Sequence, residues 1–125
     1  MGEMGSSRVD LRVRTKEFEL RIVKMYSGLP KRVEAEINGK QVFRSGTSVG
    51  ANFREAHRGR SNAEFIAKLG DCLRELEETG YWLELLVDSQ LVSAKRLAPL
   101  QDECRQLNAI LTSIAKKVKQ KVVKR

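Results

Sequence analysis

The sequence predicts an all-α protein that folds as an antiparallel four-helix bundle of up-down-up-down topology. Four segments repeat apolar residues at three- and four-residue steps, the spacing that lines one face of a helix. The connections between them are short, and no segment shows the polar–apolar alternation of a half-buried strand. A chain of 125 residues suits one domain. We expect residues 1–10 to form a flexible leader and residues 11–125 to form the bundle, with a basic C-terminal end.

The first two helices are predicted at residues 11–25 and at about residues 31–56. Gly28 and Pro30 place the break within residues 27–31, because glycine suits the position after a helix and proline suits the first turn of the next. The second helix is predicted to pack through Val33 and Ile37 and then through a stretch of small residues at 45–51. Each glycine inside this helix costs about 1 kcal/mol relative to alanine, and close helix packing is the simplest compensation. The apolar face of the first helix is Leu11, Phe18, Ile22, Met25 and Leu29.

The third helix is predicted to begin at Ser61, because the Ser61 hydroxyl and the Glu64 carboxylate form a capping box. Tyr81, Trp82 and Leu85 lie off its main apolar seam and make a second stripe. A single bundle needs one stripe per helix, so these three residues are the candidate oligomer interface, unless the bundle wraps this helix further. Both interpretations stay open. The main seam is Phe65, Leu69, Cys72, Leu76, Thr79, Leu83 and Leu86.

The fourth helix shows the most regular apolar repeat. Proline lacks an amide proton and is tolerated only in a first turn, so Pro99 predicts a regular helix from about residue 98 with a looser turn before it. Cys72 and Cys104 are far apart in the chain and lack the close pairing of a metal or redox motif, which predicts two small core residues. The repeat is Leu97, Leu100, Cys104, Leu107, Leu111, Ile114 and Val118.

Candidate catalytic and metal-binding patterns are weak. Residues 46–50 match G-x-S-x-G around Ser48, but a nucleophile elbow needs a preceding strand and an ordered acid and histidine that this helical pattern lacks. The single histidine, His57, excludes the paired Glu-x-x-His ligands of a two-metal bundle site. No phosphate-binding glycine loop is present. We therefore expect no enzyme activity, no catalytic residue, no cofactor and no metal.

The net charge of +8 is distributed unevenly along the chain. Residues 62–92 hold two basic and seven acidic side chains, whereas residues 105–125 hold seven basic ones and no acid. This density of lysine and arginine predicts salt-sensitive binding to a phosphate backbone. The alternative is that the lysine-rich end only keeps the protein soluble and complements the helix dipole. No apolar run is long enough to span a bilayer, and we expect a cytoplasmic protein. The candidate nucleic-acid-binding residues are Arg54, Arg58, Arg60, Lys116, Lys117, Lys119, Lys121, Lys124 and Arg125.

Three stretches resemble a known family: RSGTSVGANFREA at residues 44–56, AEFI at residues 63–66 after Ser61, and ETGYWL at residues 78–83. The chain resembles, over roughly residues 11–120, the bacterial four-helix-bundle proteins encoded within intervening sequences of 23S ribosomal RNA. It is more distantly similar to the accessory variability protein of diversity-generating retroelements, a basic nucleic-acid-binding partner of a reverse transcriptase. The resemblance implies a ring-like homo-oligomer, a pentamer, and brings no catalytic residue.

Together these features predict a non-enzymatic, homo-oligomeric accessory or scaffold protein that binds RNA or DNA through a basic surface. A protein partner such as a reverse transcriptase is implied by the resemblance alone. The alternative is a protein-interaction module, a ring scaffold whose positive charge has no nucleic-acid role.

Overall fold

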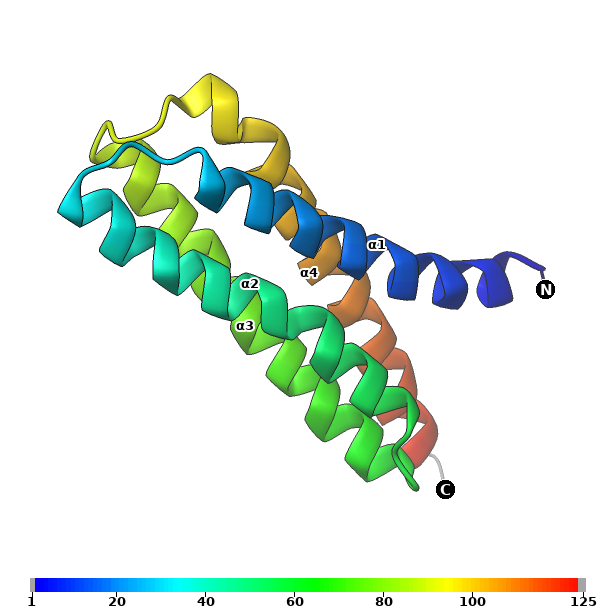
Figure 1. Cartoon of the computed structure of the whole chain (residues 1–125). Helices are drawn as coiled ribbons and strands as arrows, with labels where there is room; N and C mark the ends of the chain where they lie inside the picture. The colour runs from blue at the N-terminus through cyan, green and yellow to red at the C-terminus, as the bar shows by residue number, and fades with distance from the viewer. Residues whose placement is uncertain (1, 124–125) are drawn as a thin grey trace.

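The computed structural model of the chain describes the backbone of residues 2–123 and the side chains of residues 11–122. Four helices make up this part of the chain, and it contains no strand: α1 Gly2–Ser27, α2 Val33–His57, α3 Asn62–Asp88 and α4 Ala94–Val123 (Figure 1). The all-α, four-helix prediction is confirmed. Since α1 begins at Gly2, helical backbone extends through the stretch expected to be a leader, whose flexibility stays a prediction.

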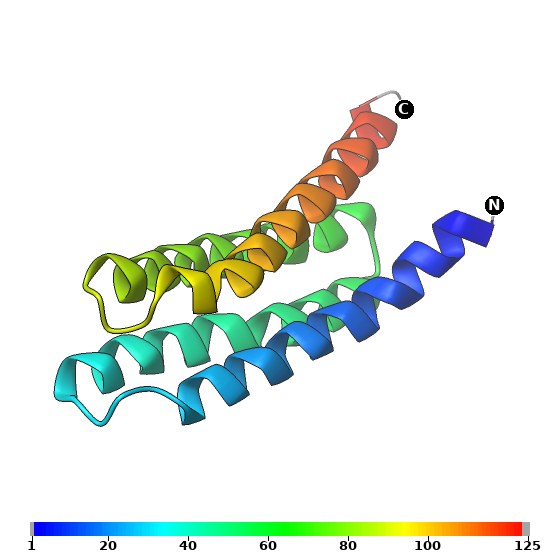
Figure 2. The ribbon, with the colours of Figure 1, turned by 90° about the horizontal axis from the view of Figure 1, so that it is seen from above.

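The helices pack in two layers, with α1 beside α2 and α3 beside α4 (Figure 2). α2 and α3 lie against each other along most of their length, and their contacts pair Ser45 with Thr79 and Glu55 with Lys68. Toward its N-terminus α1 diverges from α4 (Figures 1 and 2). Arg14 and Glu103 join these two helices through an ion pair of 2.7 Å between Nε and Oε2.

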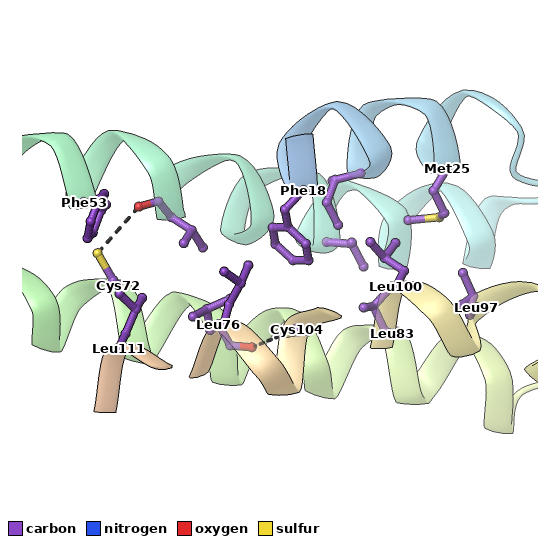
Figure 3. Close-up of a cluster of buried hydrophobic side chains, with 14 of the residues drawn as sticks. Phe18, Met25, Phe53, Cys72, Leu76, Leu83, Leu97, Leu100, Cys104 and Leu111 are labelled. Carbon is purple, nitrogen blue, oxygen red and sulfur yellow. Dashed lines mark hydrogen bonds between the residues drawn. The ribbon is translucent and has the colours of Figure 1, made fainter. Parts of the chain in front are cut away.

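Side chains from all four helices meet in one apolar core (Figure 3). Burying each leucine, isoleucine or phenylalanine contributes about 1.5–3 kcal/mol. The seams predicted for α1, α3 and α4 are confirmed, although Leu29, Phe65, Ile114 and Val118 are only partly buried. The largest fully buried side chains are Phe18, Phe53, Ile22, Leu69, Leu76, Leu83, Leu86, Leu97, Leu107, Leu111, Val42 and Val49.

Both cysteines are core residues, as predicted. The Cys72 thiol donates to the carbonyl oxygen of Val49 at 3.5 Å, and the Cys104 thiol donates to that of Leu76 at 3.2 Å (Figure 3). Burial is the main cause that raises the pKa of Cys72 to about 12 and that of Cys104 to about 11. Each cysteine therefore acts as a small apolar residue that also satisfies a carbonyl of the neighbouring helix.

The small residues of α2 allow close approach of α1. A Cβ placed on Gly46 would lie 3.0 Å from Ile22 Cγ1, so the missing side chain leaves the space that Ile22 fills. The prediction for Val33 and Ile37 is wrong, since they are 71% and 61% exposed. At 3.6 residues per turn they lie on the side of α2 opposite the buried stripe. This stripe is Ala35, Gly39, Val42, Ser45, Gly46, Val49, Gly50, Phe53 and Ala56.

The predicted start of the fourth helix is also wrong. α4 begins at Ala94, because Ser93 caps it: the Ser93 hydroxyl accepts from the amide of Arg96 at 3.2 Å. Pro99 consequently lies inside the helix, in its second turn. α2 starts at Val33, about two residues later than predicted, with extended backbone at Arg32.

The turn from α3 to α4 depends on Gln90, which has a φ of 63°. The amide of Leu91 donates to the carbonyl of Leu86 at 3.1 Å, and the amide of Gln90 donates to that of Val87 at 2.9 Å. These are the two bonds of a Schellman motif, in which glycine usually holds the left-handed position. The position expected for a left-handed glycine, Gly28, has no positive φ.

Candidate nucleic-acid interface

The C-terminal end of α2 presents three predicted arginines. Arg54 is exposed on the last turn of the helix, Arg58 is exposed at its C-cap, and Arg60 is exposed in the connection to α3. The connection is held by the predicted capping box: the Ser61 hydroxyl accepts from the amide of Glu64 at 3.1 Å. The Glu64 carboxylate in turn accepts from the amide of Arg60. These hydrogen bonds fix the backbone of the connection from which the arginine side chains extend.

A groove of about 380 Å³ runs between α1 and α2 beside these arginines. It brings Arg54 and Arg58 together with Lys16 of α1, which sequence reasoning missed. The sequence could not place Lys16 there, because nothing local says which part of α1 lies beside the end of α2. Besides these cations, the lining includes Thr15, Glu19, Thr47, Gly50 and Glu55.

Glu19 is a half-buried carboxylate inside this basic groove. Its Oε1 accepts from the backbone amide of Gly50 at 2.9 Å. A Cβ at Gly50 would lie 2.9 Å from both carboxylate oxygens, so a larger residue there would displace the Glu19 carboxylate from this position. Burial raises the pKa of Glu19, and the Gly50 amide and the charge of Arg54 partly oppose that rise.

The lysines of the C-terminal end lie on the last turns of α4. Lys116, Lys117, Lys119 and Lys121 are exposed. Lys124 and Arg125 lie outside the described residues. The end of α4 and the α2–α3 connection lie at the same end of the bundle in both views (Figures 1 and 2). Two basic segments that are far apart in the sequence thus share one end of the molecule.

The candidate oligomer residues differ in exposure. Tyr81 is 55% exposed, whereas Trp82 and Leu85 are partly buried and Trp82 packs on the core. The rings of Tyr81 and Trp82 meet edge to face with centroids 5.3 Å apart. Leu85 lines a surface pocket together with Asn38 of α2 and Leu91. Another large apolar side chain, Ile37 of α2, is 61% exposed, which sequence reasoning missed.

Ser48 lies in a helical setting, and its hydroxyl lies 2.8 Å from the carbonyl oxygen of Arg44, one turn back. It also contacts the carboxylate of Glu75. His57 packs its ring against Phe53, with centroids 4.7 Å apart. Among the described residues, no group of three or more His, Cys, Asp or Glu side chains could hold a metal ion.

Comparison with known proteins identifies the family. Residues 9–113 match the family model described as 23S rRNA-intervening sequence protein. The chain belongs to this family. It is also similar to the crystal structure of a protein of unknown function from the S23 ribosomal protein family of Bacteroides thetaiotaomicron, with 39% identity and a TM-score of 0.79. That match covers 84% of this chain and 97% of the other. A search of curated proteins gave no match.

The family match has a consequence for the two basic segments. Lys16, Arg54 and Arg58 fall inside the matched residues 9–113, whereas Lys116 and the lysines after it lie beyond them. The groove is thus built on the shared fold, and the end of α4 extends past it. In the part of the chain that the structure describes, no helix is long and apolar enough to cross a membrane.

Proposed function

We propose that this protein is a non-enzymatic accessory or scaffold protein that binds the phosphate backbone of RNA or DNA through its basic end. The observation that carries this proposal is the convergence of the α2 arginines and the α4 lysines at one end of the bundle. Each lysine or arginine that neutralises a phosphate releases condensed counterions, which gives affinity without base recognition. The net charge of +8 favours encounter with any polynucleotide.

Fluorescence anisotropy with labelled RNA and DNA single strands of about 20 nucleotides tests the proposal. We expect binding that weakens steeply between about 50 and 200 mM salt. A variant with Lys116, Lys117 and Lys119 changed to glutamine should bind more weakly and show a smaller salt slope, by about 0.7 for each lost contact. The matched control changes Lys24, Lys31 and Lys95, three exposed lysines at the opposite end, and should bind as the wild type does.

Absence of binding to either polynucleotide at low salt would overturn this function. The alternative, a protein-interaction module whose ring only organises another protein, would then stand. Equal losses in the two lysine variants would indicate non-specific attraction rather than a basic interface at one end.

The same proposal includes a ring-like homo-oligomer, a pentamer, of antiparallel up-down-up-down bundles. Large apolar side chains left open on neighbouring helices support it, namely Ile37 of α2 and Tyr81 of α3. Light scattering should give a mass several times the 14.2 kDa of the chain. Tyr81→Glu should reduce that mass, whereas Val13→Glu, an equally exposed site on α1, is the control. A wild-type mass equal to the monomer would overturn the ring.

A further inference from the structure

The cations of the α1–α2 groove are available to a ligand. Lys16, Arg54 and Arg58 are exposed, and none forms an ion pair with another described side chain. Two arginines elsewhere on the bundle show the contrast: Arg14 binds Glu103, and Arg44 binds Glu75 and Glu78. The groove therefore gathers three exposed cations, from α1 and from the C-terminal end of α2, that no described carboxylate pairs with.

The two threonine hydroxyls of the groove do not serve as donors to an anion. The Thr15 hydroxyl donates to the carbonyl oxygen of Arg12 at 3.2 Å, and the Thr47 hydroxyl donates to that of Phe43 at 2.6 Å. Their protons are therefore used within their own helices. Lysine and arginine are the donors left in this groove for an anion.

Glu19 is the acidic group that faces these donors. Its Oε1 is held by the Gly50 amide, and its charge interacts with Arg54. The second acid of the groove, Glu55, is held by Lys68 of α3 at 2.7 Å. Hence Glu19 is the carboxylate that balances the open cations in the unliganded protein.

We propose that this groove binds one phosphodiester group of a polynucleotide, with Lys16, Arg54 and Arg58 as donors and Glu19 as an internal competitor for Arg54. This inference rests on the proposed nucleic-acid function and names the site and its regulation. Glu19 competes through its charge alone, which attracts Arg54 and repels a bound phosphate. Protonation of Glu19 removes the competitor and raises the net positive charge of the groove by one.

The direction of the pH effect follows from burial. Burial raises the pKa of Glu19 above its ordinary 4.5, so the carboxylate takes up a proton at a higher pH than an exposed glutamate does. Binding should therefore tighten as the pH falls through that pKa. The other charged groups that face Glu19 are Lys16, Arg54, Arg58 and Glu55, and the pKa of Glu55 is lowered chiefly by its hydrogen bond to Lys68.

Anisotropy titrations of the full chain with rhodamine-labelled oligo-uridine and oligo-thymidine test this site. Glu19→Gln keeps an acceptor for the Gly50 amide and removes the charge. It should bind both strands more tightly at neutral pH, by about fivefold at 0.1 M salt, which is the value of one phosphate contact at a slope of about 0.7. Its affinity should also change less with pH than that of the wild type.

The controls separate this site from general charge effects. Glu17→Gln removes an exposed carboxylate of the same helix that does not line the groove, and it should change affinity by much less. His57→Gln removes the one imidazole of the chain, and the pH dependence should persist. Arg54→Gln, at an exposed position that leaves the core intact, should weaken binding to both strands.

Equal affinities of wild type, Glu19→Gln and Arg54→Gln would overturn the groove as a subsite. If the lysine variant of α4 still lost affinity, the proposed function would survive that result. A protein that bound neither strand at low salt would overturn both. A response of oligo-uridine alone would restrict the site to RNA, and equal responses would support recognition of the shared phosphodiester.

Discussion

The hydroxyl groups of Ser45 on α2 and Thr79 on α3 lie 2.8 Å apart in the core, where neither residue is exposed. Each hydroxyl also lies close to a carbonyl of its own helix: Ser45 Oγ is 2.8 Å from the oxygen of Gln41, and Thr79 Oγ1 is 2.7 Å from that of Glu75. The two hydroxyl protons are thus shared between one hydrogen bond that joins the two helices and one hydrogen bond within a single helix. This pair fixes the register of α2 against α3 without leaving a buried polar group unsatisfied.

Removing either hydroxyl should destabilise the bundle modestly. We expect Thr79→Val and Ser45→Ala each to lower the free energy of unfolding by about 1 kcal/mol, because each removes a buried hydrogen bond. The remaining hydroxyl keeps its hydrogen bond to a carbonyl of its own helix. The double variant should cost less than the sum, since each single variant already loses the one interhelical hydrogen bond that the two hydroxyls share. Urea denaturation followed by circular dichroism measures all three. Strict additivity would show that the two hydroxyls are not coupled.

Glycine-to-alanine substitutions should separate packing from helix propensity. Gly70 is exposed on α3 and a Cβ there would contact nothing within 4 Å, so Gly70→Ala should stabilise by about 1 kcal/mol. Gly46→Ala gains the same propensity, but its Cβ would lie 3.0 to 3.3 Å from three atoms of the buried Ile22. We expect Gly46→Ala to destabilise. Equal melting-temperature gains in the two variants would contradict the close packing of α1 on α2.

Gln90 should be replaceable by glycine with a gain in stability. Its φ of 63° lies in the left-handed region, where a side chain is disfavoured and glycine is not. Gln90→Gly should therefore stabilise by up to about 1 kcal/mol, as read from thermal melts. Gly is unfavourable inside a helix, so Gln101→Gly, within α4, is the opposite control and should destabilise.

The carboxylate of Glu19 should lower stability at neutral pH. Since its pKa is raised in the folded state, the stability that it contributes is present below its ordinary 4.5 and lost as the pH rises through the folded-state value. Glu19→Gln should then melt at a higher temperature than the wild type at pH 7, and the two should converge below about pH 4.5. Glu17→Gln controls for the loss of one charge. A pH-independent difference would indicate a packing effect instead.

Both cysteines should resist thiol reagents in the folded protein. Burial raises the pKa of Cys72 to about 12 and that of Cys104 to about 11, so little reactive thiolate exists at pH 8. Reaction with an aromatic disulfide should be slow in buffer and complete in denaturant. Fast labelling without denaturant would show that α3 or α4 opens readily.

Much of the fold could be predicted because the relevant signals are local. The seam of α3 from Leu69 to Leu86 and that of α4 to Leu111 follow a three- and four-residue alternation that any amphipathic helix must keep. The start of α3 was predicted from two adjacent capping residues, Ser61 and Glu64. The start of α4 was misplaced, because Pro99 was given more weight than the cap at Ser93.

The candidate interface could be predicted only in part. Density of lysine and arginine identified Arg54 and Arg58, since charge can be counted along the chain. Lys16 and Glu19 could not be found this way, because their relevance depends on α1 lying beside the end of α2. Gly50 is the one local signal that pointed toward the groove, since a glycine inside a helix indicates that another group packs closely against its backbone.

The amino-acid sequence by itself determined that this chain forms four amphipathic helices with a basic C-terminal end, because periodicity, caps and charge are properties of neighbouring residues. Only the tertiary structure decided which face of α2 is buried. There, Ile22 fills the space over Gly46, and that contact turns Val33 and Ile37 to the surface against their own hydrophobicity. The same packing of α1 on α2 places Glu19 on Gly50 and creates the groove. Contacts between distant segments set these features, and no local pattern encodes them.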